Sequence, residues 1–79
     1  MSIKVRYFAS LKEKAGRSED VLDPVENLTA RDVWSLCMPG KAVPDNTLVA
    51  INMNYAEWNS VVRDGDEVAF FPPVTGGTG

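Results

Sequence analysis

The chain has 79 residues, of which 44% are hydrophobic and 24% are charged, and its formal net charge at pH 7 is −3. These values predict a single globular domain with one modest core, and they argue against an intrinsically disordered chain. The negative charge argues against nucleic acid or an anionic membrane as the main partner and favours a protein with a basic surface.

Histidine is absent from the sequence, and Cys37 is the only cysteine. The commonest general base and metal ligand are therefore missing, and no internal disulfide can form. We expect no self-contained active site, no metal site and no tightly bound cofactor. Lys4 and Arg6 stand where a secretion signal would be apolar, and no stretch approaches the ~18–20 apolar residues of a membrane span. The sequence thus predicts a cytoplasmic protein.

The first predicted strand covers residues 3–8, where apolar and charged side chains alternate. A period of two is typical of a strand with one buried face. Ile3, Val5 and Tyr7 are therefore expected in the core. Phe8 is expected on the opposite face, among charged neighbours.

A short helix and an edge strand are predicted next. Residues 10–13, Ser-Leu-Lys-Glu, have the pattern of a capping box, and Gly16 lies where a short helix would end. Residues 18–23 read as a strand with charged side chains along it, which is typical of a sheet edge. Pro24 ends this strand.

The main helix is predicted to begin after Thr29, a good N-cap, with Asp32 at the third helical position. An apolar stripe follows, made of Val33, Trp34, Leu36 and Cys37. Cys37 is thus expected to pack as a small buried hydrophobe and not to react. Residues 39–40, Pro-Gly, end the helix.

Three short strands are predicted in the second half of the chain. Residues 48–51 form a continuous apolar run, and a turn at 52–54 leads into residues 55–56. Another turn is expected at residues 64–65, before the last strand at 67–71.

Two groups of side chains in this half are expected at the surface. Trp58 lies between Glu57 and Asn59, which suggests a surface turn. The acidic residues around the predicted turn at residues 64–65 are expected to be solvated, although a metal site or docking to a basic partner surface were alternatives; they are Asp64, Asp66 and Glu67.

The order of elements predicts an α+β fold, in which a mixed sheet is covered by one main helix. The β-grasp roll is the economical arrangement of this kind, and by analogy its first and last strands lie side by side at the sheet centre. We expect residues 1–73 to form this β-grasp domain and residues 74–79 to form a flexible C-terminal tail.

Alternation in the last strand predicts an exposed aromatic pair. Val68 and Phe70 are expected in the core, which places Phe71 on the face that also carries Phe8. Exposed aromatic residues rimmed by charges are typical of protein interfaces. The alternative is that the rings pack in a small cluster under the first helix, against Leu11.

The C-terminal segment resembles a delivery arm, although a frayed terminus is the plainer interpretation. Residues 72–73 are prolines, which stiffen the exit from the domain, and Gly76 and Gly77 have no Cβ, so they could pass through a narrow channel. Residues 74–77 could span about 13–14 Å. An adenylated terminal carboxylate can accept sulfur, and a partner would have to supply that chemistry.

Residues 5–16 and 65–77 resemble the opening and the ending of the small, sulfur-carrier subunit of molybdopterin synthase. The resemblance implies a ubiquitin-like β-grasp fold and a role in molybdenum cofactor biosynthesis. It also implies two partners: a ubiquitin-activating-type adenylyltransferase, which uses ATP, and the large catalytic subunit of the synthase, in a heterotetramer.

The resemblance further implies roles for particular residues. Gly77 would be adenylated and would then carry the thiocarboxylate. Val74, Thr75 and Gly76 would insert into the large subunit. The partner interface would contain Phe8 and Phe71.

The chain departs from this family pattern after Gly77, where Thr78 and Gly79 follow. The Gly77 carbonyl is then held in a peptide bond, so we expect Thr78 and Gly79 to be removed before sulfur is loaded. Two alternatives to the synthase subunit are a thiamine-pathway sulfur carrier, which usually lacks the helix predicted at residues 10–15, and a ubiquitin-like protein modifier or binding module.

Overall fold

The computed structural model describes residues 1–73, so the C-terminal segment 74–79 lies outside the described residues. The elements are, in chain order, β1 (Ile3–Tyr7), α1 (Ser10–Ala15), β2 (Glu19–Leu22), α2 (Ala30–Cys37), β3 (Leu48–Ile51), β4 (Asn54–Ala56) and β5 (Glu67–Phe71). Their order confirms the predicted α+β class. Within residues 1–73, neither helix is long and apolar enough to cross a membrane.

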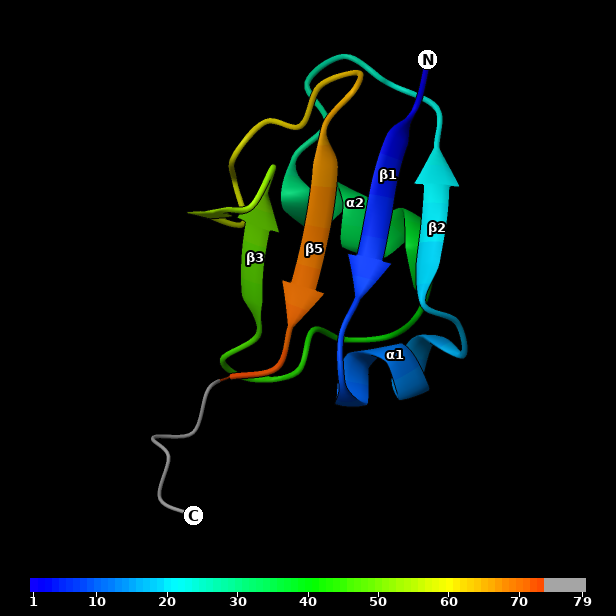
Figure 1. The fold of residues 1–79 in the computed structure, drawn as a ribbon, viewed down its shortest axis with the longest axis vertical. Helices are drawn as coiled ribbons and strands as arrows, with labels where there is room; N and C mark the ends of the chain where they lie inside the picture. Colours follow the sequence, from blue (N-terminus) through cyan, green and yellow to red (C-terminus); the bar gives the residue numbers. More distant parts are fainter. Residues whose placement is uncertain (74–79) are drawn as a thin grey trace.

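The five strands form one mixed sheet in the order β2-β1-β5-β3-β4. β1 and β5 pair in parallel, whereas the other neighbouring strands are antiparallel. The central position of β1 and β5 and the edge position of β2 confirm the predicted β-grasp arrangement. Figure 1 shows α2 across one face of the sheet and α1 beside the carboxyl end of β1.

The core lies between the sheet and α2. The inward side chains of β1 and β5 are almost completely buried, as predicted from their alternation; they are Ile3, Val5, Tyr7, Val68 and Phe70. Trp34 of α2 meets Phe70 edge to face, with 5.2 Å between ring centroids. Such aromatic contacts add about 0.5–1.5 kcal/mol beyond the burial of area. The Trp34–Phe70 contact thus connects the helix to the sheet centre.

The predicted capping box at the start of α2 is confirmed. The Asp32 N–H donates to the Thr29 hydroxyl at 3.2 Å, and the Thr29 N–H donates to the Asp32 carboxylate at 3.0 Å. The hydrogen bond from the Thr29 backbone lowers the pKa of Asp32. These bonds satisfy two donors that the first turn would otherwise leave unpaired.

Leu36 does not belong to the buried stripe of α2, contrary to the prediction. Its side chain is 56% exposed, whereas Val33, Trp34 and Cys37 are buried. Each helical residue turns by about 100°, so Leu36 falls outside the arc that the three buried residues occupy. The apolar stripe is therefore narrower than its composition suggests.

The predicted capping box at Ser10 is also wrong. The N-cap of α1 is Ala9, whose methyl group cannot accept a hydrogen bond. The Lys12 N–H bonds to the Ala9 carbonyl at 3.0 Å, so the helical pattern begins one residue earlier than the side chains indicate. At the other end, Gly16 has φ 78 and caps the helix, as predicted.

Trp58 lies in a turn, as predicted, but its side chain is partly buried against the core and not simply at the surface. Its ring stacks on Phe70 with centroids 5.5 Å apart and meets Trp34 at 6.2 Å. The Arg31 N–H donates to the Trp58 carbonyl at 3.0 Å, which ties this loop to the first turn of α2. Polar neighbours in sequence conceal these contacts, which exist only in the folded chain.

We expect Ala9→Gly to raise the free energy of unfolding by about 1 kcal/mol. Ala9 has φ 53 and ψ −128, a conformation that suits glycine. Strain of this kind costs ~1–3 kcal/mol, and glycine would relieve it. The extra conformational entropy that glycine gives the unfolded chain offsets ~0.5–1 kcal/mol of that gain. Ala15→Gly, the same change within α1, should instead lower stability by about 1 kcal/mol. Urea unfolding measures both, and equal losses at the two positions would contradict the strain argument.

Candidate partner-binding face

The sheet face opposite α2 carries the predicted aromatic pair. The rings of Phe8 and Phe71 stack with centroids 5.0 Å apart and planes 8° from parallel. Phe8 remains 39% exposed, whereas Leu11 is buried in the core. The structure therefore favours the exposed pair over a cluster under the first helix.

Strand register places these two rings together. In the parallel β1–β5 pair, Arg6 lies opposite Ala69 and Tyr7 lies opposite Phe70. The Phe8 N–H donates to the Phe70 carbonyl at 3.2 Å, which continues the pairing past the end of β1. Side chains alternate between faces, so the next residues after Tyr7 and Phe70 both point away from α2.

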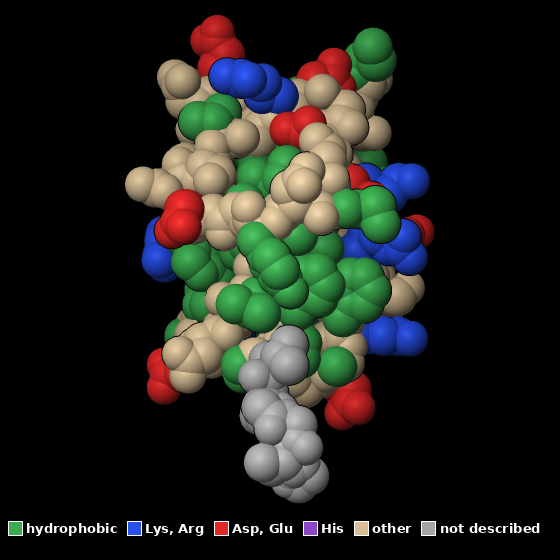
Figure 2. Space-filling model, turned by 60° about the vertical axis from the view of Figure 1, so that its left-hand side comes forward, with side chains coloured by type: hydrophobic (Ala, Val, Ile, Leu, Met, Phe, Trp, Pro, Cys, Tyr) green, Lys and Arg blue, Asp and Glu red, His purple; other side chains and the backbone are tan. Residues whose placement is uncertain are grey.

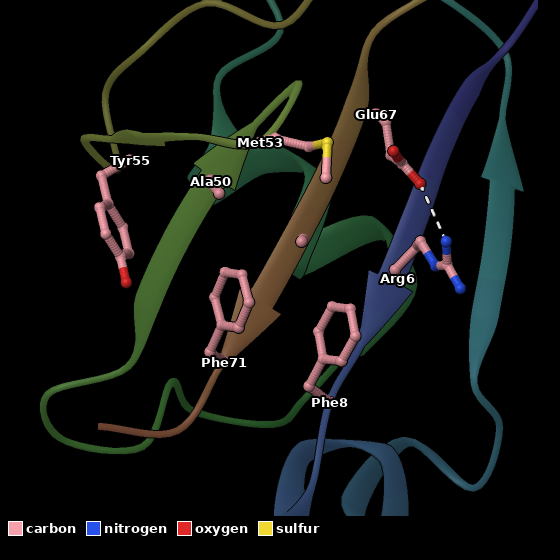
Figure 3. Close-up of a pocket in the computed structure, with 8 residues that line it drawn as sticks. Arg6, Phe8, Ala50, Met53, Tyr55, Glu67 and Phe71 are labelled. Carbon is pink, nitrogen blue, oxygen red and sulfur yellow. Dashed lines mark hydrogen bonds and ion pairs between the residues drawn. The ribbon is translucent and has the colours of Figure 1, made fainter. Parts of the chain in front are cut away.

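An open hollow of about 310 Å³ lies beside the aromatic pair (Figure 3). Ala50 and Ala69 are cross-strand partners on its floor, and their methyl groups leave space above the sheet. The hollow is lined by Arg6, Phe8, Ala50, Met53, Tyr55, Glu67, Ala69 and Phe71. We call these eight residues the docking face. Figure 2 shows hydrophobic side chains gathered over this side, with Lys and Arg along one flank.

The polar rim of the docking face is an ion pair between Arg6 and Glu67, with Nη1 and Oε2 3.4 Å apart. The Arg6 guanidinium also lies 5.9 Å from the Phe8 ring centroid. The two side chains are 49% and 33% exposed. An exposed ion pair of this kind contributes ~0–1 kcal/mol to stability. A partner could therefore replace it with ion pairs to its own side chains at little cost in free energy.

Tyr7, Arg17 and Asp20 form a hydrogen-bonded network at the edge of the core. The Tyr7 hydroxyl donates to Asp20 at 2.8 Å, and the Arg17 guanidinium bonds to Asp20. Arg17 also donates to the carbonyls of Ala15 at 2.7 Å and Cys37 at 2.6 Å. Burial, followed by the side-chain interactions with Cys37 and Asp20, raises the pKa of Tyr7. One guanidinium thus links α1, β2 and the end of α2.

Cys37 is buried, which confirms the packing prediction. Burial raises the pKa of its thiol, and the interaction with Tyr7 only partly opposes that shift. A nucleophilic cysteine needs exposure and a lowered pKa. Cys37 has neither, so it is unsuited to carry sulfur itself.

Asp66, the acidic residue directly before β5, is engaged in local hydrogen bonds. Asp66 accepts from the Arg63 N–H at 2.8 Å and from the Asn52 side-chain amide at 2.9 Å. Within residues 1–73, no group of three or more acidic or cysteine side chains is arranged to hold a metal ion. The Asp66 carboxylate thus connects the turn at residues 52–53 to the turn before β5.

Of the residues predicted to form the site, the structure brings Phe8 and Phe71 together. Val74, Thr75, Gly76 and Gly77 lie outside the described residues, so their roles stay predictions. Six docking-face residues were not predicted as site residues: Arg6, Ala50, Met53, Tyr55, Glu67 and Ala69. Alternation does place Arg6, Glu67 and Ala69 on the face of Phe8 and Phe71. Alternation along residues 48–56 could have placed Ala50 and Tyr55, but a turn residue such as Met53 follows no such period.

The model of the ThiS family matches residues 5–77. The chain belongs to the ThiS family. It is 38% identical to the molybdopterin synthase sulfur carrier subunit of Escherichia coli (strain K12), over 95% of this chain and 99% of that protein. The resemblance inferred from residues 5–16 and 65–77 is thereby confirmed.

Solved structures share the fold along nearly the whole chain. Small archaeal modifier protein 1 of H. volcanii has a TM-score of 0.78 and 25% identity, over 92% of this chain and 98% of that one. A putative molybdopterin converting factor subunit 1 from Pyrococcus furiosus has a TM-score of 0.74 and 28% identity, over 94% and 99%. These likenesses confirm the predicted ubiquitin-like β-grasp class.

We expect Phe8→Ala and Phe71→Ala to be non-additive in stability. The two rings stack directly on each other, so the two changes should couple by about 0.5–1.5 kcal/mol. A matched cycle of Phe8→Ala with Val25→Ala, in the loop before α2, should be additive within ~0.3–0.5 kcal/mol. Urea unfolding of the single and double variants measures both cycles. Additivity of the two phenylalanine changes would show that the stacking contributes nothing.

Proposed function

We propose that this protein is the sulfur-carrier subunit of a molybdopterin synthase. The observation that carries the proposal is its 38% identity, over nearly the full length of both chains, to a protein of that name. The position of the docking face supports it, because Phe71 ends the strand that leads toward Gly76 and Gly77. A protein that receives Gly77 would therefore meet this face.

In the proposed cycle, an adenylyltransferase partner joins the Gly77 carboxylate to the AMP part of ATP and releases pyrophosphate. A sulfide-level donor then attacks the acyl-adenylate, expels AMP and leaves a thiocarboxylate. The thiocarboxylate delivers its sulfur to the pterin precursor in the large catalytic subunit, and water restores the carboxylate. ATP is thus used by the partner, and this chain needs no cofactor of its own.

Loading at Gly77 requires a free carboxylate, but Gly77 is joined to Thr78. We therefore propose that hydrolysis of the Gly77–Thr78 peptide bond precedes adenylation. A peptide carbonyl cannot be adenylated, because the bond to AMP is formed by the nucleophilic oxygen of a free carboxylate. Cleavage would release Thr78 and whatever follows it.

The side chains of this chain fit a role in binding, with catalysis supplied by a partner. The chain has no histidine, and Cys37 is buried with a raised pKa. We propose that residues 1–73 bind and orient, and that the large subunit, in a heterotetramer with this chain, supplies the catalytic groups. Phe8 and Phe71 would provide the central contact with that subunit.

A protein modifier is the second candidate function. The fold likeness to small archaeal modifier protein 1 favours it. Activation of Gly77 would be identical, but a lysine amine would displace AMP and form an isopeptide bond. A thiamine-pathway carrier is less favoured, because the sulfur-carrier relative is of the synthase type and α1 is present at Ser10–Ala15.

We expect a chain that ends at Gly77 to gain sulfur when it is mixed with its adenylyltransferase, ATP and a sulfide donor. Intact mass spectrometry should show one oxygen replaced by sulfur. The full sequence should stay unloaded until the Gly77–Thr78 bond is cut. Gly76→Trp in the trimmed chain is the control variant. The bulky side chain should keep the C-terminus out of a narrow channel in the adenylyltransferase, so this variant should gain no sulfur.

Three outcomes separate the hypotheses. Sulfur on an intact Gly79 would contradict cleavage. Conjugates through lysine amines, without thiocarboxylate, would favour the modifier. A trimmed chain that never gains sulfur beside an active adenylyltransferase would contradict the carrier function as a whole.

We expect Phe8→Ala and Phe71→Ala each to weaken binding to the large synthase subunit by at least about tenfold, as is typical of central aromatic contacts. Leu36→Ala is the matched control, because Leu36 is an exposed apolar residue on α2, which covers the other face. Calorimetry measures affinity, and circular dichroism checks the fold. Equal affinities for all three variants would place the interface elsewhere.

A further inference from the structure

The turn between β3 and β4 holds a methionine where glycine would be less strained. Ile51 pairs with Asn54, so the connection consists of Asn52 and Met53. Their φ values are 52 and 69. Two successive positive φ values are the mark of a type I′ hairpin turn, for which Asn-Gly is the preferred pair. Asn52 fits the first position, whereas Met53 occupies the glycine position at a cost in backbone strain.

Burial does not explain the methionine. Met53 is 92% exposed, so its side chain gains almost nothing from the core. It nevertheless lines the docking face, and Figure 3 shows its thioether directed from the turn across β5, on the same side as the rings of Phe8 and Phe71. Neither local conformation nor core packing accounts for this residue.

Asn52 fixes the backbone from which Met53 projects. The Asn52 N–H donates to the Glu67 carbonyl at 2.8 Å, and the Glu67 N–H donates to the Asn52 side-chain oxygen at 3.0 Å. The Asn52 amide also donates to Asp66 at 2.9 Å. The turn is thus anchored to the start of β5, while the unbranched Met53 side chain keeps its freedom. A fixed base with an adaptable apolar side chain is suited to fill an irregular recess in a partner.

We propose that Met53 is a partner-recognition residue whose thioether enters an apolar recess of the large synthase subunit. The inference rests on the proposed function. The occupant follows from continuity: β5 leads to the segment that would be inserted, and the hollow runs along β5 from Phe71 at its end to Met53 beside its start. A protein that receives the segment and covers Phe71 would therefore reach Met53 as well.

Met53→Gly tests the inference, because its effects on stability and on binding should have opposite signs. The midpoint of urea unfolding should stay the same or rise, since glycine relieves the positive φ. Affinity for the large subunit should fall about five- to tenfold, as for a contact worth more than ~1 kcal/mol. Met53→Leu should keep affinity within about twofold, because shape and apolarity are largely retained. A residue with only a structural role would lose stability and affinity together.

The outcomes distinguish this inference from the proposed function. If Met53→Gly binds as tightly as the unchanged chain while Phe8→Ala binds weakly, the role of Met53 is wrong and the carrier function stands. If the unchanged chain does not bind the large subunit at all, both fail. If Met53→Gly instead abolishes a dimer of this chain without affecting the synthase complex, the face serves self-association and the inference is overturned.

Discussion

The parallel pairing of β1 with β5 is the constraint on which the docking face depends. Residues from opposite ends of the sequence are brought into one register, with Arg6 opposite Ala69 and Tyr7 opposite Phe70. The same register that buries Tyr7 and Phe70 under α2 must turn Phe8 and Phe71 outward, because side chains alternate. A slip of one residue would exchange the two sets and lose the core. Core stability and the exposed aromatic pair are therefore consequences of a single pairing.

The two faces of the sheet differ in what their aromatic residues do. On the covered face, Trp34 and Trp58 pack around Phe70. These contacts complete the core, which is small because a short chain buries a small fraction of its surface. On the open face, Phe8 and Phe71 stack on each other beside Tyr55 and Arg6, and both rings remain at least partly exposed. Apolar area left exposed in this way contributes little to folding. Its presence is better explained by association, as the open hollow beside it also indicates.

Much of this fold could be predicted from the sequence, because the deciding signals are local. Alternation gave the faces of β1 and β5, and the Thr29 and Asp32 side chains gave the start of α2. The errors have different causes, one long-range and one local. Trp58 is half-buried because a distant strand and helix receive it, and the start of α1 is set by backbone bonds at Ala9. The docking face was predicted at Phe8 and Phe71, where alternation applies. It was missed at Met53, where only turn geometry decides.

Backbone strain gives an independent reason to assign function to the open face. Within residues 1–73, the non-glycine residues with positive φ are Asn27, Asn46 and Asn52, together with Ala9 and Met53. Asparagine tolerates this conformation, so the three asparagines need no special explanation. Ala9 and Met53 do need one, and both adjoin the docking face: Ala9 follows Phe8 directly, and Met53 lines the hollow. Strain that persists at a binding surface is retained when it orients side chains for a partner. The reactive group of this chain would lie in its C-terminal segment. The main contribution left to the folded domain is therefore to orient side chains toward a partner.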